Sequence, residues 1–79
     1  MKRLVILGAG GHGRVAADIA GKNGYDSIAF LDDTKKTSGR YPVIGESARF
    51  SEYDCDFFVA IGNPQVRRRM QEMLLTAGK

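Results

Sequence analysis

RLVILGAGGHGRV, residues 3–15, carries the main indication of the fold in this 79-residue chain. Its apolar first part, residues 3–7, contains β-branched side chains and ends at a glycine, which predicts a buried strand. The glycine-rich residues 8–13 are then expected to form a loop, and residues 14–23 a helix. Gly24 is expected to end that helix in a left-handed conformation. The apolar side chains of the helix share one face and are Val15, Ala16, Ile19 and Ala20.

The rest of the chain continues the alternation of strand and helix. Strands are expected over residues 27–31 and 56–61, because both runs are apolar and contain β-branched or aromatic side chains. Residues 34–41 are polar and are expected to form a loop, residues 42–45 a brief extended piece, and residues 46–53 a short helix. The strand expected over residues 56–61 is apolar on both faces, which is the pattern of an interior parallel strand.

A second long helix is expected to follow the last strand. Asn63 can cap it, Pro64 suits its first position, and Gly78 is expected to stop it. Its apolar face comprises Val66, Met70, Met73, Leu74 and Ala77. This alternation predicts an α/β chain, a small Rossmann-like three-layer domain with a short parallel sheet and flanking helices. The length predicts a single domain over residues 1–79.

The composition is that of a soluble globular chain, because 43% of residues are hydrophobic and 27% are charged. The net charge of +3 suits an anionic ligand, although ordinary surface lysines produce the same value. The basic run at residues 67–69 has no interleaved aromatic side chains, so no nucleic-acid partner is expected. The single cysteine, Cys55, excludes an intrachain disulfide and is expected to be structural. Without a leader or a membrane-length apolar run, we expect a cytoplasmic location and no membrane contact.

The glycines at positions 8, 10 and 13 have the G-x-G-x-x-G spacing of the dinucleotide-binding fingerprint. In that arrangement Gly8 permits a tight turn, Gly10 lets the backbone approach a ligand, and Gly13 lets the helix lie close to the strand. Gly11 adds further backbone freedom. The first N–H groups of the helix and its dipole suit a phosphate. The alternative is a strand-to-helix turn that binds no ligand.

Three polar side chains near this loop are candidates for ligand contact. Asp32 lies 19 residues beyond Gly13. Dinucleotide-binding domains carry an acid for ribose hydroxyls at that position, and Asp33 could serve equally. The alternative for this acid pair is a turn at the end of the strand. His12 could donate to a phosphate or sugar oxygen, or it could face solvent. No metal site is expected, because the chain has no second histidine, and His12 has no evident catalytic partner.

A third segment, Gly62–Asn63, follows the last expected strand. Its N–H groups could meet a second part of the same ligand, the alternative being simple capping by Asn63. Arg67, in the first turns of the next helix, is the candidate basic contact. Because the carboxyl ends of parallel strands meet at one edge, residues 8–13, the acid pair and Gly62–Asn63 are expected to converge there. In open α/β sheets that edge is where ligands bind.

Four stretches of this chain together resemble a known family. They are LGAGGHGRVAADIAGKNGY, IAFLDD, YPVIGE and FFVAIGNPQVRRRM. Taken together, they are similar to the N-terminal domain of bacterial nucleotide-sugar acyltransferases, the sialic acid O-acetyltransferase and bacillosamine N-acetyltransferase type. The resemblance runs from about Arg3 to the end of the chain.

The resemblance implies a function for each part of the candidate site. In that family the domain binds a UDP-linked amino sugar, with Gly10, Gly11 and His12 contacting the ligand. The acid pair contacts the nucleotide portion, and Gly62 borders it. A second, left-handed β-helix domain of that family binds acetyl-CoA, carries the catalytic histidine and forms trimers. Hexapeptide repeats of that kind do not occur in this sequence, so we expect an isolated substrate-binding domain with no catalytic residue and no cofactor of its own.

Two other functions are compatible with the residues alone. The first is an NAD(P)-binding Rossmann domain of a dehydrogenase or a redox-responsive regulator, which the glycine spacing permits. The second is an oligomerisation domain that binds no ligand. The chain is also expected to self-associate, because the strand at 56–61 would have an open apolar edge if no further strand pairs with it.

Overall fold

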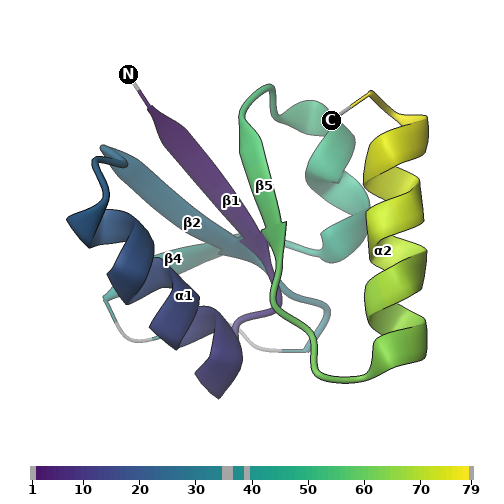
Figure 1. The fold of residues 1–79 in the computed structure, drawn as a ribbon, viewed down its shortest axis with the longest axis horizontal. Helices are drawn as coiled ribbons and strands as arrows, with labels where there is room; N and C mark the ends of the chain where they lie inside the picture. Colours follow the sequence, from purple (N-terminus) through teal and green to yellow (C-terminus); the bar gives the residue numbers. More distant parts are fainter. Residues whose placement is uncertain (1, 35–36, 39, 79) are drawn as a thin grey trace.

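The computed structural model describes residues 2–34, 37–38 and 40–78 as one sheet with helices packed against it (Figure 1). The sheet has the strand order β3-β4-β2-β1-β5. In chain order the elements are β1 (Arg3–Leu7), α1 (Gly11–Lys22), β2 (Ser27–Leu31), β3 (Thr37–Ser38), β4 (Tyr41–Gly45), the 3-10 helix η1 (Ser47–Glu52), β5 (Asp56–Val59) and α2 (Pro64–Thr76).

The four longer strands are parallel, and only the two-residue β3 runs antiparallel, against β4. From β1 the chain moves outward to β2 and β4, then crosses back to place β5 on the other side of β1. The strand order therefore reverses between β1 and β5, which is the place where open α/β sheets bind ligands. The predicted Rossmann-like α/β class is confirmed.

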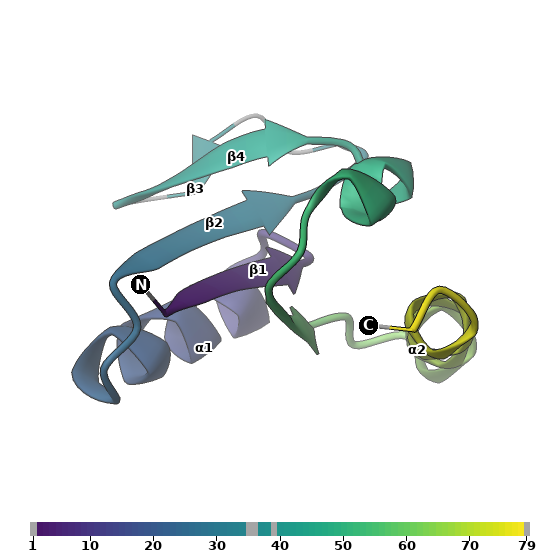
Figure 2. The same ribbon diagram turned by 90° about the horizontal axis from the view of Figure 1, so that it is seen from above.

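The helices lie on both faces of the sheet, so the domain has three layers. Viewed from above, α1 lies on one side of the strands, and η1 and α2 lie on the other (Figure 2). Leu4, Ile6 and Phe30 face α1, whereas Val5, Leu7 and the neighbouring Leu31 face η1 and α2. Successive residues of a strand point to opposite faces, and both faces are covered, so β1 is apolar throughout.

The buried face of α1 differs from its expected apolar face. Ala17 and Ala20 are buried and Ala16 is half-buried, whereas Val15 and Ile19 are 58% and 57% exposed. The helix lies so close to the sheet that small side chains occupy the contact, and the larger ones are displaced to its side. The four apolar side chains that were expected to share one face are therefore divided between the contact with the sheet and the exposed side of the helix.

Three further boundaries differ from expectation. The helix α1 starts at Gly11 rather than residue 14, with Arg14 N donating to Gly10 O at 3.0 Å, so Gly11, His12 and Gly13 are helical and not loop. The expected loop at 34–41 contains β3, which pairs with β4. The last strand ends at Val59, and β1 is its one neighbour within the described residues. An interior position for this strand is therefore not observed, and no described strand pairs with its second edge.

The other expected boundaries agree with the structure to within about one residue. Gly24 and Gly78 have φ angles of 90° and 77° and follow α1 and α2 in the left-handed region that favours glycine. The expected short helix at 46–53 forms as η1, with the tighter 3-10 winding. On α2, Leu74 is buried but Ala77 is exposed, because it lies past the last helical residue. Among the described residues, each helix is too short or too polar to cross a bilayer.

Candidate functional site

The segments after β1, β2 and β5 meet at the carboxyl edge of the sheet, as predicted. Gly8 N donates to Leu31 O at 2.9 Å, and Ala60 N donates to Leu7 O at 2.8 Å. These bonds extend the parallel pairing by one residue beyond each strand. The end of β1 is therefore held on both sides, and the loop that follows it starts from a fixed position.

The glycines of the loop fall into two groups. Gly8 has a φ of 109°, and a Cβ there would lie 2.6 Å from Ala60 O. A Cβ on Gly13 would lie 2.0 Å from Gly8 O, so both positions require glycine for packing. Around Gly10 and Gly11, by contrast, a Cβ would meet no atom within 4 Å. These two face open space at the start of α1, where backbone N–H groups have no intrahelical acceptor.

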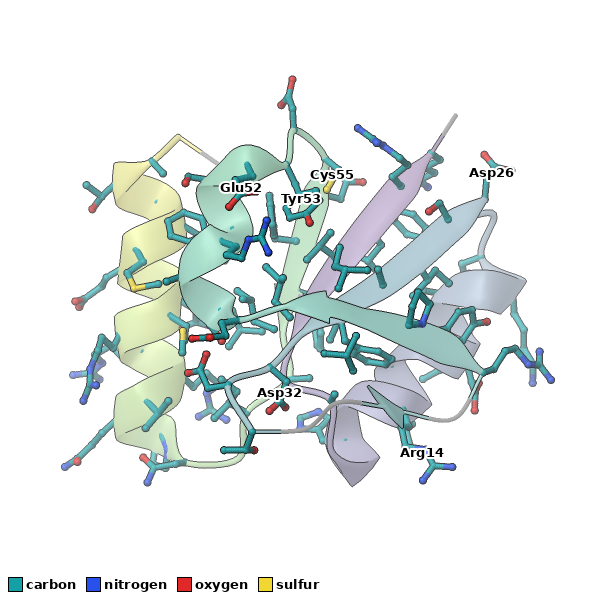
Figure 3. All side chains as sticks on the ribbon, turned by 180° about the vertical axis from the view of Figure 1, so that it is seen from behind. Arg14, Asp26, Asp32, Glu52, Tyr53 and Cys55 are labelled. Carbon is teal, nitrogen blue, oxygen red and sulfur yellow. The ribbon has the colours of Figure 1, made fainter. Side chains whose placement is uncertain are left out.

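Asp32 is turned into the protein. Its Oδ2 accepts a hydrogen bond from Ala9 N at 2.7 Å, and its Oδ1 accepts from Thr34 N at 2.9 Å and Thr34 Oγ1 at 3.1 Å. Figure 3 shows it at the end of β2, with Asp26 at the opposite end of the sheet. The first of these bonds joins the end of β2 to the glycine loop. Asp32 therefore already serves the loop, whatever else it contacts.

Asp33 and Asn63 also have structural partners. Asp33 Oδ1 accepts from Ser47 N at 2.9 Å and so satisfies a donor at the start of η1, although the side chain remains exposed. Asn63 Oδ1 accepts from Gln65 N at 2.9 Å and Val66 N at 3.2 Å, which confirms its predicted capping of α2. Gly62 is exposed beside it, and a Cβ at that position would meet no atom within 4 Å.

The two basic candidates lie at the same edge but on different helices. His12, the second residue of α1, is exposed, and its ring makes an edge contact with Phe58 at a centroid distance of 6.4 Å and an interplanar angle of 78°. Arg67 is half-buried in the first turns of α2. Arg14, which the sequence pattern did not indicate, is exposed on α1. The one sequence feature that could have indicated Arg14 is its position directly after the glycine-rich residues 8–13.

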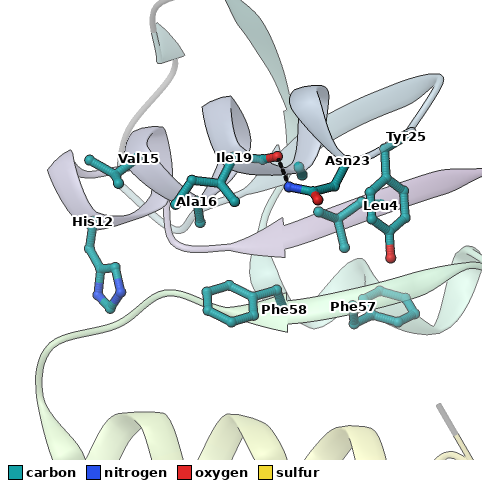
Figure 4. A pocket seen from close by; sticks show the side chains of 10 residues that line it. Leu4, His12, Val15, Ala16, Ile19, Asn23, Tyr25, Phe57 and Phe58 are labelled. Carbon is teal, nitrogen blue, oxygen red and sulfur yellow. Dashed lines mark hydrogen bonds between the residues drawn. The ribbon is translucent and has the colours of Figure 1, made fainter.

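An apolar groove between α1 and β5 was not foreseen. It encloses about 400 Å³ and runs from His12 to Tyr25, with Val15, Ile19 and Phe58 along it (Figure 4). The signal that could have found it is the pair of large side chains beside the alanines of α1.

A polar cluster closes the far end of this groove. Tyr25 Oη donates to Asp56 Oδ2 at 2.7 Å, and the Lys2 ammonium lies 4.5 Å from the Tyr25 ring centroid. The bond to the Asp56 carboxylate is the main cause that raises the pKa of Tyr25 above its ordinary value of 10.0, because ionising the phenol would break it. Desolvation and the negative charge of Asp56 act in the same direction.

The potential metal ligands and the cysteine are the remaining side chains that bear on the chemistry of the site. Within residues 2–34, 37–38 and 40–78, no three His, Cys, Asp or Glu side chains gather as metal ligands. Cys55 lies at the other end of the sheet, where it packs against the cluster containing Val5 and Leu74. The carboxyl edge itself brings together the first N–H groups of α1, the glycine backbone, Asp32, Asp33 and the basic side chains of His12 and Arg67.

Comparison with known proteins identifies relatives of this arrangement. The family described as the PglD N-terminal domain matches residues 3–74. The acetyltransferase domain of PglB from Neisseria gonorrhoeae FA1090, in complex with acetyl coenzyme A, superimposes with a TM-score of 0.89 at 36% sequence identity. A second structure of that domain superimposes with a TM-score of 0.88 at 35% sequence identity. The alignments cover 98% and 99% of this chain but only 40% and 41% of the PglB domain.

Proposed function

The chain belongs to the PglD N-terminal domain family, and we therefore propose that it binds a UDP-linked amino sugar for a sugar acetyltransferase that uses acetyl-CoA. The PglB structures that it matches are acetyltransferase domains. The observation that carries the proposal is the convergence of the glycine loop, the acid pair and Gly62 where the strand order reverses. This is the edge at which a domain of this architecture receives a nucleotide.

Each part of the edge has a role in this proposal. The N–H groups that open α1 receive the phosphates, because Gly10 and Gly11 leave them uncovered. His12 donates to a phosphate or sugar oxygen. The remaining contacts border the nucleotide and come from Asp33, Gly62, Asn63 and Arg67, with Gly8, Gly13 and Asp32 shaping the site. The action is positional, since binding presents the sugar to an acetyl donor held elsewhere.

The hydrogen bonds of Asp32 argue against its serving as the ribose-binding acid of a dinucleotide-binding domain. A dinucleotide-binding domain presents the acid after its second strand to ribose hydroxyls. Here both oxygens of Asp32 accept bonds from the chain itself, from Ala9 and Thr34. Ribose recognition by this carboxylate would have to displace or share those donors, at a cost of about 1–3 kcal/mol for a donor left unsatisfied.

The acetyl transfer itself is assigned to a longer protein. This chain spans about two fifths of the PglB domain that it matches. In the proposal this chain supplies no catalytic residue and binds no cofactor. Acetyl-CoA is the co-substrate of the parent protein. The parent protein assembles as a trimer through its other domain. The parent protein acts in the cytoplasm, where sugar nucleotides and acetyl-CoA are both available.

A titration followed by amide NMR tests the proposal. The chain is titrated in turn with UDP, UDP-N-acetylglucosamine and NADH. We expect both UDP ligands to shift the amides of residues 10–13, 32–33 and 62–63, and NADH to shift none of them. The amides of Gly24 and Gly78, which follow the helices at positions away from the edge, are internal controls.

The other outcomes separate the alternatives. Shifts with NADH alone would overturn the proposal in favour of a dinucleotide-binding domain. If none of the three ligands shifts these amides, the remaining alternative is an oligomerisation domain that binds no ligand. Shifts with UDP-N-acetylglucosamine at residues other than those of the carboxyl edge would contradict the assigned site.

A further inference from the structure

The carboxylate of Asp32 holds the backbone of the glycine loop rather than standing free at the edge. The bond from Ala9 N to Asp32 Oδ2, at 2.7 Å, spans from β2 to the loop after β1, and we name it the Asp32–Ala9 tether. Asp32 is itself fixed, because its own N donates to Gly45 O at 2.9 Å and its Oδ1 closes the turn at Thr34. The tether therefore has a rigid anchor.

The tether acts on the residues that would meet a ligand. Ala9 is 2% exposed, and it immediately precedes Gly10, the residue before the first turn of α1. Gly10 provides no side-chain cap, so the N–H groups of that turn depend on the backbone path for their direction. Fixing Ala9 fixes where those N–H groups point.

The negative charge of Asp32 by itself is expected to lower the affinity of the loop for an anion. A carboxylate at hydrogen-bond distance from Ala9 N brings a negative charge to the loop whose next N–H groups would receive a phosphate, and like charges repel. If charge were its main influence, removing it would strengthen anion binding. If geometry is its main influence, removing it weakens anion binding, so the sign of the effect tells the two apart.

We infer that Asp32 is a positioning residue, which orders the phosphate-binding loop through Ala9 N and does not itself recognise the nucleoside. The identity of the ligand in this inference rests on the proposed function. The tether itself rests on the hydrogen bonds alone. It divides the acid pair, with Asp33 left as the acid whose exposed side chain borders the nucleotide.

Three variants and two ligands test the inference. Asp32→Ala removes the tether, and Asp32→Asn removes the charge but keeps an oxygen that can accept from Ala9 N. The matched control is Asp26→Ala, because Asp26 Oδ2 likewise accepts a backbone N–H, from Lys2 at 2.9 Å, at the opposite end of the sheet. Affinities are measured for inorganic pyrophosphate and for UDP, and amide hydrogen exchange at Ala9 is measured without ligand.

Asp32→Ala is expected to lower the affinities for pyrophosphate and UDP by the same factor, about tenfold, and to accelerate amide hydrogen exchange at Ala9. Asp32→Asn should retain both affinities within about threefold, since one acceptor is kept. Asp26→Ala should change neither affinity. A loss of UDP affinity with unchanged pyrophosphate affinity, in either Asp32 variant, would overturn the inference, because it would mean direct nucleoside contact. Unchanged exchange at Ala9 in a folded Asp32→Ala would overturn it as well.

The test separates this inference from the proposed function. If the unaltered chain binds neither UDP nor pyrophosphate, the proposed function fails, while faster exchange at Ala9 in Asp32→Ala still supports the tether. If Asp32→Ala does not fold, the Asn variant decides. Retained affinity for both ligands then supports positioning, and a loss confined to UDP overturns it.

Discussion

Gly13 shows how one missing side chain sets the approach of a helix to a sheet. A Cβ at this position would lie 2.0 Å from Gly8 O and 3.2 Å from the Phe30 ring. The backbone oxygen cannot move aside without displacing the loop. We expect Gly13→Ala to destabilise the fold by about 3 kcal/mol or more, measured as the free energy of unfolding in urea.

Gly10→Ala is the matched control for that substitution, because open space surrounds Gly10. Its stability should change by less than about 0.5 kcal/mol. Its affinity for UDP should nevertheless fall, since the added methyl stands where the ligand approaches. Equal stability losses in the two variants would contradict the packing role assigned to Gly13.

The hydrogen bond between Tyr25 and Asp56 makes a contribution to stability that depends on pH. The hydrogen bond to Asp56 raises the pKa of Tyr25 in the folded state above 10.0. Since the folded value is the higher one, the stabilisation is present below 10.0 and is lost as pH rises through the raised value. An NMR titration of the Tyr25 ring should show the delayed ionisation. In Asp56→Asn the ring should ionise earlier, and identical titrations would contradict the assignment.

Among the elements, α2 depends on its first turn. Asn63 Oδ1 accepts from both Gln65 N and Val66 N, and Pro64 needs no such acceptor. We expect Asn63→Ala to cost about 1 kcal/mol of stability and to speed amide exchange at those two donors. Asn63→Asp, which keeps the acceptor, should retain the stability of the unaltered chain. A loss in both variants would point to a role other than capping.

The two helices use their apolar residues differently. In α1 the alanines meet the sheet and the larger Val15 and Ile19 line the groove, whereas in α2 the large Leu74 is buried. Helical spacing predicts both apolar faces but not this difference. How close each helix lies to the sheet decides it, and for α1 that distance follows from the contact between Gly13 and Gly8.

In the molecule as a whole, β5 and the groove beside it form a surface suited to association. Within the described residues β5 pairs only with β1, and Val15, Ile19 and Phe58 are 58%, 57% and 44% exposed. An open apolar edge invites pairing with another chain. We therefore expect the isolated chain to self-associate at high concentration, which sedimentation velocity would show as a mass above that of the monomer.

Two charged substitutions locate that association. Ile19→Glu, in the groove, should shift the chain toward monomer. Leu75→Glu is the matched control, because Leu75 is 75% exposed on α2 and does not line the groove. A monomeric unaltered chain at high concentration, or equal effects of the two variants, would contradict association through this surface.

The α/β class, the parallel pairing and the convergence of three segments at one edge could all be predicted from the sequence. These follow from local patterns: apolar runs of strand length, helical spacing, and glycine, asparagine and proline at element ends. Gly24, Asn63 and Gly78 all do what their residue types predict. The four quoted stretches were also enough to indicate the family that the comparisons identify.

The depth and direction of individual side chains depended on tertiary packing. Packing turned Asp32 toward Ala9 and exposed Val15 and Ile19. None of these follows from the residue types, because a carboxylate accepts equally from a ligand or from a backbone N–H. Which donor lies within reach is set by how closely the helix and strands approach, and that distance exists only once the chain has packed.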